Sequence, residues 1–80
     1  MARVVFPDHL LGATGGEREV AVIAENYREL VEKLEARWPG IGERLSKSAV
    51  AIDGQIYQDA FLEPIEAASE VFFMPRIEGG

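Results

Sequence analysis

The chain has 80 residues, a net charge of −6 and no cysteine, and this length predicts one small domain that buries roughly 60% of its unfolded surface. The missing cysteines exclude disulfides, thiolate metal sites and thiol nucleophiles, and the acidic surplus argues against nucleic-acid or anionic-membrane partners. No apolar run is long enough to span a bilayer and the first residues lack a signal-peptide pattern, so we expect a cytoplasmic location.

The beginning of the chain predicts two strands joined by a loop. Residues 3–6 are β-branched and aromatic and stop at Pro7, which is typical of a strand. Residues 8–16 contain three glycines and predict a loop. Residues 18–23 alternate polar and apolar side chains, so we expect a second strand that pairs with the first.

A helix is predicted next, because Asn26 and Glu29 have the spacing of a capping box. Pro39 cannot continue a helix, so the helix should end near Arg37 or Trp38. Its apolar residues recur at three- and four-residue spacing and form one stripe: Tyr27, Leu30, Val31, Leu34 and Trp38.

The stretch that follows predicts a β-hairpin. Residues 41–48 are ambiguous between a loop and a short helical turn. Residues 49–52 are typical of a buried strand, Asp53-Gly54 is a strong hairpin signal, and residues 55–57 are the expected return strand.

The last part of the chain predicts a loop and a final strand. Residues 58–69 show little periodicity, and we expect Phe61, Leu62 and Ile65 to hold this loop or short turn against the core. Residues 70–74 are apolar and β-forming and predict the last strand.

The order of these elements predicts an α+β fold, with a mixed sheet of about five strands and one main helix packed on one face. We expect residues 1–75 to form the domain and residues 76–80 a flexible tail that ends in Gly-Gly. Glycine has no Cβ, so Gly79 can pass through a narrow slot while the α-carboxylate of Gly80 enters another protein's active site.

The segment from Glu70 to the terminal Gly-Gly resembles the end of the ThiS/MoaD sulfur-carrier family. Element order and length fit that family over essentially the whole chain, so the resemblance implies a ubiquitin-like β-grasp fold. It also implies that a partner activating enzyme uses ATP and Mg²⁺ to adenylate Gly80, that the carboxylate becomes a thiocarboxylate, and that a synthase subunit accepts the sulfur. The chain would then be a carrier without a cofactor of its own, not an enzyme.

The branch of the family is indicated by the stretch before the tail. The helix length, the Phe-Phe-Met-Pro run and residues 62–65 resemble the MoaD branch more than the ThiS branch. Residues 66–69 depart from the acidic-glycine turn that is common before the final strand of the family.

Side-chain alternation predicts an apolar patch on the open face of the sheet. If Val71 and Phe73 face the helix, Phe72 and Met74 face away from it. The same rule directs Val4, Phe6, Val50 and Ile52 inward and Val5, Ala49 and Ala51 outward. A contiguous exposed apolar patch marks a contact surface, and the alternative is that residues 58–69 cover Phe72 and Met74.

In the family, the sheet surface beside the tail docks against the activating enzyme. The resemblance places Met74 and Ile56 at this contact, with Phe72, Pro75 and Arg76 as further partner-binding residues. Methionine suits a surface that must pack against several partners in turn.

Other patterns predict no chemistry. The glycine-rich residues 12–16 lack the lysine and the following helix of a P-loop, which leaves a plain turn. His9 has no nucleophile motif beside it. The acidic residues of the second half do not have calcium-loop spacing, so we expect no metal site: Asp53, Asp59, Glu63 and Glu66.

Three functions follow from the sequence. The first is a sulfur carrier for molybdopterin synthesis, with thiamine, cysteine or thionucleotide synthesis as other recipients. The second is a ubiquitin-like modifier whose Gly80 forms isopeptide bonds with lysines of other proteins. The third is an interaction module whose tail takes part in no reaction.

Overall fold

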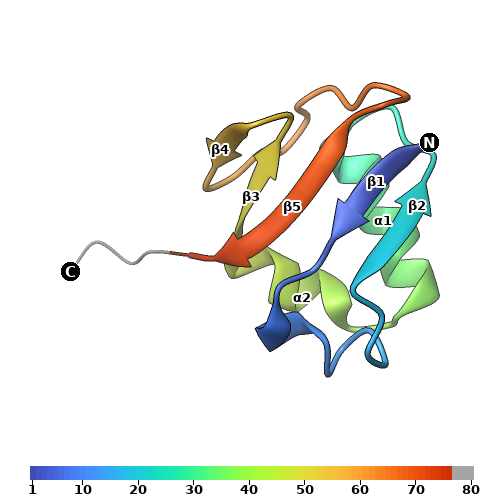
Figure 1. The fold of residues 1–80 in the computed structure, drawn as a ribbon, viewed down its shortest axis with the longest axis vertical. Coiled ribbons are helices and arrows are strands. Elements are labelled where there is room, and N and C mark those ends of the chain that lie inside the picture. The colour runs from blue at the N-terminus through green and yellow to red at the C-terminus, as the bar shows by residue number, and fades with distance from the viewer. Residues whose placement is uncertain (77–80) are drawn as a thin grey trace.

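The computed structural model describes residues 1–76 and contains a five-stranded mixed sheet with helix α1 packed across one face (Figure 1). The strands lie in the order β2-β1-β5-β3-β4, with β1 parallel to β5 and the other neighbours antiparallel. This arrangement confirms the predicted α+β fold. The elements are β1 (Ala2–Val5), the 3₁₀ helix η1 (Asp8–Leu10), β2 (Glu19–Val22), α1 (Tyr27–Arg37), α2 (Ile41–Ser46), β3 (Ser48–Ile52), β4 (Gln55–Tyr57) and β5 (Glu70–Pro75).

The predicted strands and the main helix agree with these bounds to within about one residue. The first two strands are shifted or shortened slightly, and β5 continues to Pro75, which lies opposite Ser48 at the end of the ladder. The predicted tail, residues 76–80, lies outside the described residues except for Arg76.

Helix α1 begins and ends where its local signals predict. The side chain of Asn26 accepts a hydrogen bond of 2.8 Å from the backbone N–H of Glu29, which satisfies an orphan donor of the first turn. The Glu29 carboxylate lies 3.5 Å from the ammonium of Lys33, so an ion pair takes the place of the reciprocal half of the capping box. Leu30 and Leu34 bury the apolar stripe against the sheet.

Helix α2 resolves the ambiguity of residues 41–48, and its N-terminus is capped by a side chain from α1. Gly40 at the N-cap has a φ of 96° and no side chain to offer. The two carboxylate oxygens of Glu35 instead accept from the backbone N–H groups of Gly40 and Gly42, at 2.9 and 2.8 Å. These backbone bonds hold the pKa of the Glu35 carboxyl below its usual value.

The core lies between the sheet and the helices, and aromatic rings join its layers. Phe6, just beyond β1, stacks on Phe73 of β5 with a centroid distance of 5.9 Å. The same Phe6 ring meets Trp38 edge-on at 5.7 Å. The residues predicted to face inward are all buried: Val4, Phe6, Val50, Ile52, Val71 and Phe73.

The prediction for residues 58–69 is partly wrong. Ile65 is buried, but Phe61 and Leu62 are 64% and 52% exposed. They occupy a turn in which Phe61 has a φ of 48°. A hydrogen bond from the N–H of Glu63 to the carbonyl of Ala60 closes this turn. Buried Ala60 and Ile65 hold the loop against the core in place of Phe61 and Leu62.

The hairpin between β3 and β4 depends on positive φ angles at both central residues, 50° at Asp53 and 86° at Gly54. We expect Gly54→Ala to lower the free energy of unfolding by about 1–2 kcal/mol, because a Cβ disfavours this backbone conformation. The control is Gly12→Ala, where an added Cβ meets nothing within 4 Å and φ is not in the left-handed region. Urea denaturation of both variants measures the difference, and equal midpoints would contradict the assignment of the turn.

The Glu35 cap predicts a pH dependence of stability. A carboxyl whose pKa is lowered on folding contributes stability at pH values above its unfolded pKa, about 4.3, and loses it as the pH falls through the folded pKa. We expect Glu35→Gln to flatten the dependence of Tm on pH below about pH 5. Glu32→Gln is the control, since the Glu32 carboxylate only lies 3.9 Å from Arg28. Thermal melts from pH 7 to pH 2 test this, and parallel curves for wild type and Glu35→Gln would refute it.

Candidate functional site

The last strand presents two different faces to its surroundings. Phe73 is 4% exposed and packs into the core, whereas its neighbour Phe72 is 38% exposed on the face of the sheet that α1 leaves open. Met74, on the same side as Phe72, is partly exposed. The loop of residues 58–69 therefore does not cover Phe72, and the alternation predicted for β5 is confirmed, whereas in β3 the outward-predicted Ala49 is buried.

The strand register places the exposed apolar residues side by side. Ala51 lies opposite both Phe72 and Ile56, and Phe72 also lies opposite Val5. Ala49 lies opposite Met74 but is only 2% exposed, so it supports the surface without being accessible. We call the accessible set the open-face patch: Val5, Ala51, Ile56, Phe72 and Met74.

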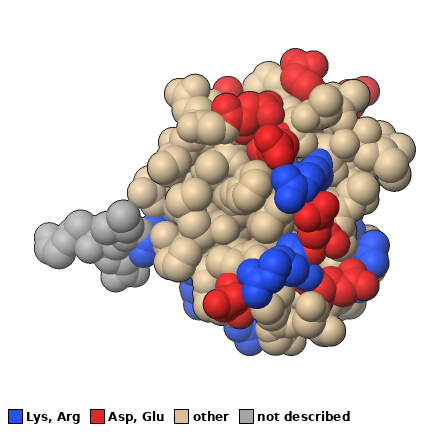
Figure 2. All heavy atoms as spheres, in the orientation of Figure 1, with Lys and Arg blue, Asp and Glu red and all other residues tan. Residues whose placement is uncertain are grey.

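Figure 2 shows this face directly, with an uncharged expanse on the side where β5 ends and charged groups toward β1 and β2. An exposed apolar area of this kind, bordered by polar groups, is typical of a protein contact surface.

The charged border centres on Arg3 of β1. Its guanidinium lies 3.0 Å from the carboxylate of Glu19 and 2.7 Å from that of Glu70, and its Cζ lies 5.6 Å from the centroid of the Phe72 ring. The hydrogen bond from Arg3 lowers the pKa of Glu19, and the two carboxylates raise the pKa of Arg3, so both shifts favour the charged form of the group.

The remaining predicted site residues lie beside the patch. Ile56 on β4 is 62% exposed, and Pro75 ends β5 in an exposed position. Arg76 donates a hydrogen bond to the carbonyl of Gln58, which fixes the point where the chain leaves the sheet. Gly79 and Gly80, the predicted reacting end, lie outside the described residues.

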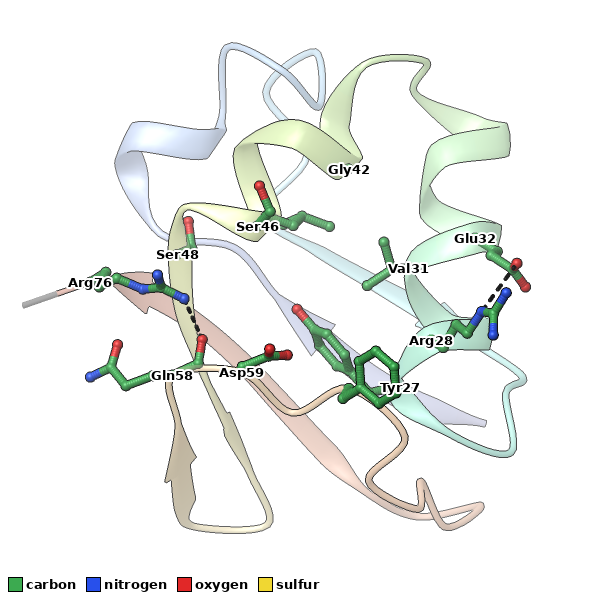
Figure 3. A pocket seen from close by; sticks show the side chains of 12 residues that line it. Tyr27, Arg28, Val31, Glu32, Gly42, Ser46, Ser48, Gln58, Asp59 and Arg76 are labelled. Atoms are coloured by element: carbon green, nitrogen blue, oxygen red, sulfur yellow. Dashed lines mark hydrogen bonds and ion pairs between the residues drawn. The ribbon is translucent and has the colours of Figure 1, made fainter.

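A cleft of about 430 Å³, which no sequence motif predicts, opens on the helix side of this exit point (Figure 3). Helices α1 and α2, the start of β3 and residues 58–61 surround it, and Arg76 stands at its edge. Figure 3 shows the ring of Tyr27 inside the cleft between the helices and Asp59. Burial, with a contribution from the charge of Asp59, raises the pKa of Tyr27 to about 12, so its phenol is neutral in the physiological range.

The other candidate residues have structural partners. The hydroxyl of Thr14 in the glycine-rich turn donates to the carbonyl of Glu17 at 2.7 Å, which stabilises the turn. His9 Nε2 lies 3.4 Å from the hydroxyl of Ser48. Within residues 1–76, no three His, Asp or Glu side chains come together as metal ligands, and no helix there is long and apolar enough to cross a membrane.

Comparison with solved structures shows the same architecture in several small proteins. CysO from the BexX/CysO complex of Amycolatopsis orientalis superposes over 100% of both chains with a TM-score of 0.86 and 21% identity. The small archaeal modifier protein 1 of Methanosarcina acetivorans gives 0.81 and 15% identity over 99% of this chain and 95% of that one. A chain from the complex of subunits 1 and 2 of Helicobacter pylori molybdopterin-converting factor gives 0.67 and 19%, over 99% and 97%.

The chain is a ubiquitin-like β-grasp domain. This finding confirms the fold that the resemblance implies. No protein-family model and no curated protein sequence matches the chain, so the similarity is carried by structure. Two of the similar β-grasp chains come from complexes with other proteins, BexX in one case and the second subunit of molybdopterin-converting factor in the other.

The two faces of the β-grasp sheet predict losses of stability of different size for the neighbouring residues Phe72 and Phe73. We expect Phe73→Ala to lower the free energy of unfolding by about 3–5 kcal/mol, because it leaves a cavity against Phe6 and Tyr27. The same change at Phe72 should cost clearly less, because Phe72 is already 38% exposed and its truncation leaves no closed cavity. Chemical denaturation of the two variants provides the measurement, and a similar loss at both positions would mean that the open face is covered.

Proposed function

We propose that this chain is a sulfur carrier of the ThiS/MoaD family, whose Gly80 carboxylate is adenylated and thiocarboxylated by a partner activating enzyme. The observation that carries the proposal is the position of the open-face patch along β5, whose last residue, Pro75, lies four positions before Gly79 and five before Gly80. The fold shared over the whole chain with CysO and with molybdopterin-converting factor supports it. The proposal requires that Gly80 carries a free α-carboxylate.

The chemistry needs little from the carrier itself. A carboxylate oxygen of Gly80 attacks the α-phosphorus of ATP and pyrophosphate leaves, which gives an acyl-adenylate. A hydrosulfide ion supplied by the partner system then attacks the carbonyl and AMP leaves, which gives the thiocarboxylate at Gly80 after loss of the sulfur-bound proton. The partner enzyme contributes ATP, Mg²⁺ and the catalytic groups, while the carrier contributes the reacting group and its delivery.

The described residues have positional roles in this scheme. The open-face patch would contact the activating enzyme, with Phe72 and Ile56 as its most exposed large side chains. Arg76, held to the carbonyl of Gln58, would set the direction in which the last residues leave the domain. Met74 lies between Phe72 and Arg76 along the chain, and its flexible side chain can repack against the enzyme that later accepts the sulfur.

The recipient pathway is part of the proposal. The sequence features before the tail favour molybdopterin synthesis, and cysteine and thiamine synthesis are the other recipients. A second function, a modifier joined through Gly80 to lysines of other proteins, is favoured by the structural similarity to small archaeal modifier protein 1.

An intact-mass experiment tests the proposal. The full chain is incubated with an activating enzyme of this class, ATP, Mg²⁺ and sulfide, and we expect a mass increase equal to the difference between sulfur and oxygen. The mass increase should be absent in a variant that lacks Gly80. In Phe72→Ala the KM of the activating enzyme for the carrier should rise, while the maximal rate stays unchanged. Leu62→Ala is the matched control, because Leu62 is exposed but lies outside the patch.

The other functions predict other masses. Adducts on lysines of added proteins would favour the modifier. An unchanged mass, together with full biological activity after deletion of Gly79 and Gly80, would contradict tail chemistry altogether.

A further inference from the structure

The contacts of Arg3 differ from those of an ordinary surface arginine. Its side chain extends over the open face from the centre of the sheet, and carboxylates from both flanking strands bind it, Glu19 of β2 and Glu70 of β5. All three side chains are about half exposed, so each ion pair contributes little to folding stability. Two anchors in different directions nevertheless fix the position of the guanidinium.

The guanidinium is held against the one large aromatic ring of the open-face patch. Its Cζ lies 5.6 Å from the centroid of Phe72, within the range of a cation–π interaction. Val5 lies opposite Phe72 on β1 and Ala51 lies opposite it on β3. Arg3 adds the cation–π contact to the ring, and its own position is set by the two carboxylates.

This arrangement also gives the open-face patch a boundary. The patch ends at Arg3 and Glu70 toward the start of β5 and at Glu19 beyond Val5 on β2, whereas in the opposite direction it continues through Ala51 to Ile56. Figure 2 shows the same division between uncharged and charged surface. The apolar part is the part that adjoins the end of β5 and Arg76.

We propose that Arg3 is a positioning residue for docking: clamped by Glu19 and Glu70, it holds the Phe72 ring and confines an apolar partner surface to the half of the sheet that leads to Arg76. This inference rests on the proposed function, since it concerns the same docking event. The partner that fits this half carries an apolar side chain, aliphatic or aromatic, that packs between Phe72 and Ile56. It carries no carboxylate opposite Glu19 and Glu70, whose two negative charges exceed the single charge of Arg3.

The alternative is that the clamp only stabilises the fold. Exposed ion pairs and an exposed cation–π contact are worth little in folding, so that role predicts small, similar effects for any such arginine. A positioning role predicts an effect on docking that a comparable arginine elsewhere does not share.

The chain contains a matched control in Arg37. Its guanidinium lies 2.9 Å from the carboxylate of Glu17, and its Cζ lies 4.8 Å from the centroid of the Trp38 ring. It thus combines an ion pair and a cation–π contact at the end of α1, away from the open-face patch. Arg3→Met and Arg37→Met remove the same charge and the same kind of contact.

The test compares these two variants with wild type and Arg3→Lys in two measurements. The first is the NMR signal of the Phe72 ring in the free protein, which should shift in Arg3→Met and stay unchanged in Arg37→Met. The second is the Kd for the activating enzyme without ATP, together with KM and kcat for thiocarboxylation. We expect Arg3→Met to raise Kd and KM about two- to fivefold with kcat unchanged, and Arg3→Lys to lie between.

The outcomes separate this inference from the proposed function. If the mass increase occurs but Arg3→Met binds like Arg37→Met, or more tightly than wild type, the role of Arg3 is refuted. If wild type binds in an Arg3-dependent way without gaining mass, the docking inference stands and the sulfur chemistry fails. An unchanged Phe72 signal in Arg3→Met also refutes the clamp, and a wild type that does not bind the enzyme overturns both.

Discussion

The parallel pairing of β1 with β5 is the constraint on which the rest of the molecule depends. It joins the first and last strands in the middle of the sheet, with Val4 opposite Val71 and Val5 opposite Phe72. On the inner side this pairing lets Phe6 stack on Phe73, which connects the sheet to the helix layer. A parallel pair cannot be closed by a hairpin, so its formation carries the loop-closure entropy of the long segment between these two strands.

The same pairing gives the domain two chemically different faces. Each inward residue of β5 adds to a small core, and each outward residue lies on a face that no helix covers. In a domain of 80 residues the core leaves little stability to spare, so an uncovered phenylalanine and isoleucine bring no folding advantage at the surface. Their placement beside the exit of the chain is better explained by contact with another protein than by folding.

Elements with local signals could be predicted from the sequence, whereas features that depend on contacts between distant residues could not. Helix α1 and the hairpin at Asp53-Gly54 carry their own caps and turn residues, so the sequence was sufficient for both. Helix α2 depends on a cap from Glu35 of the preceding helix, and residues 41–48 carry no local signal that distinguishes a helix from a loop. The clamp of Arg3 joins residues 67 positions apart, and the cleft forms from four separate elements, which no spacing along the chain encodes.

A carrier that is charged by one enzyme and unloaded by another must release each in turn. Under the proposed function both partners act on Gly80, and the open-face patch lies beside Arg76, the last described residue, so the two partners would compete for it. Tight binding to either would slow the transfer, since affinity is adjusted mainly through dissociation. The open-face patch is small, contains one large ring and a flexible methionine, and has a charged boundary. These features suit binding of a partner with moderate affinity and a defined orientation. In that view the open face limits affinity and the clamp of Arg3 supplies the orientation.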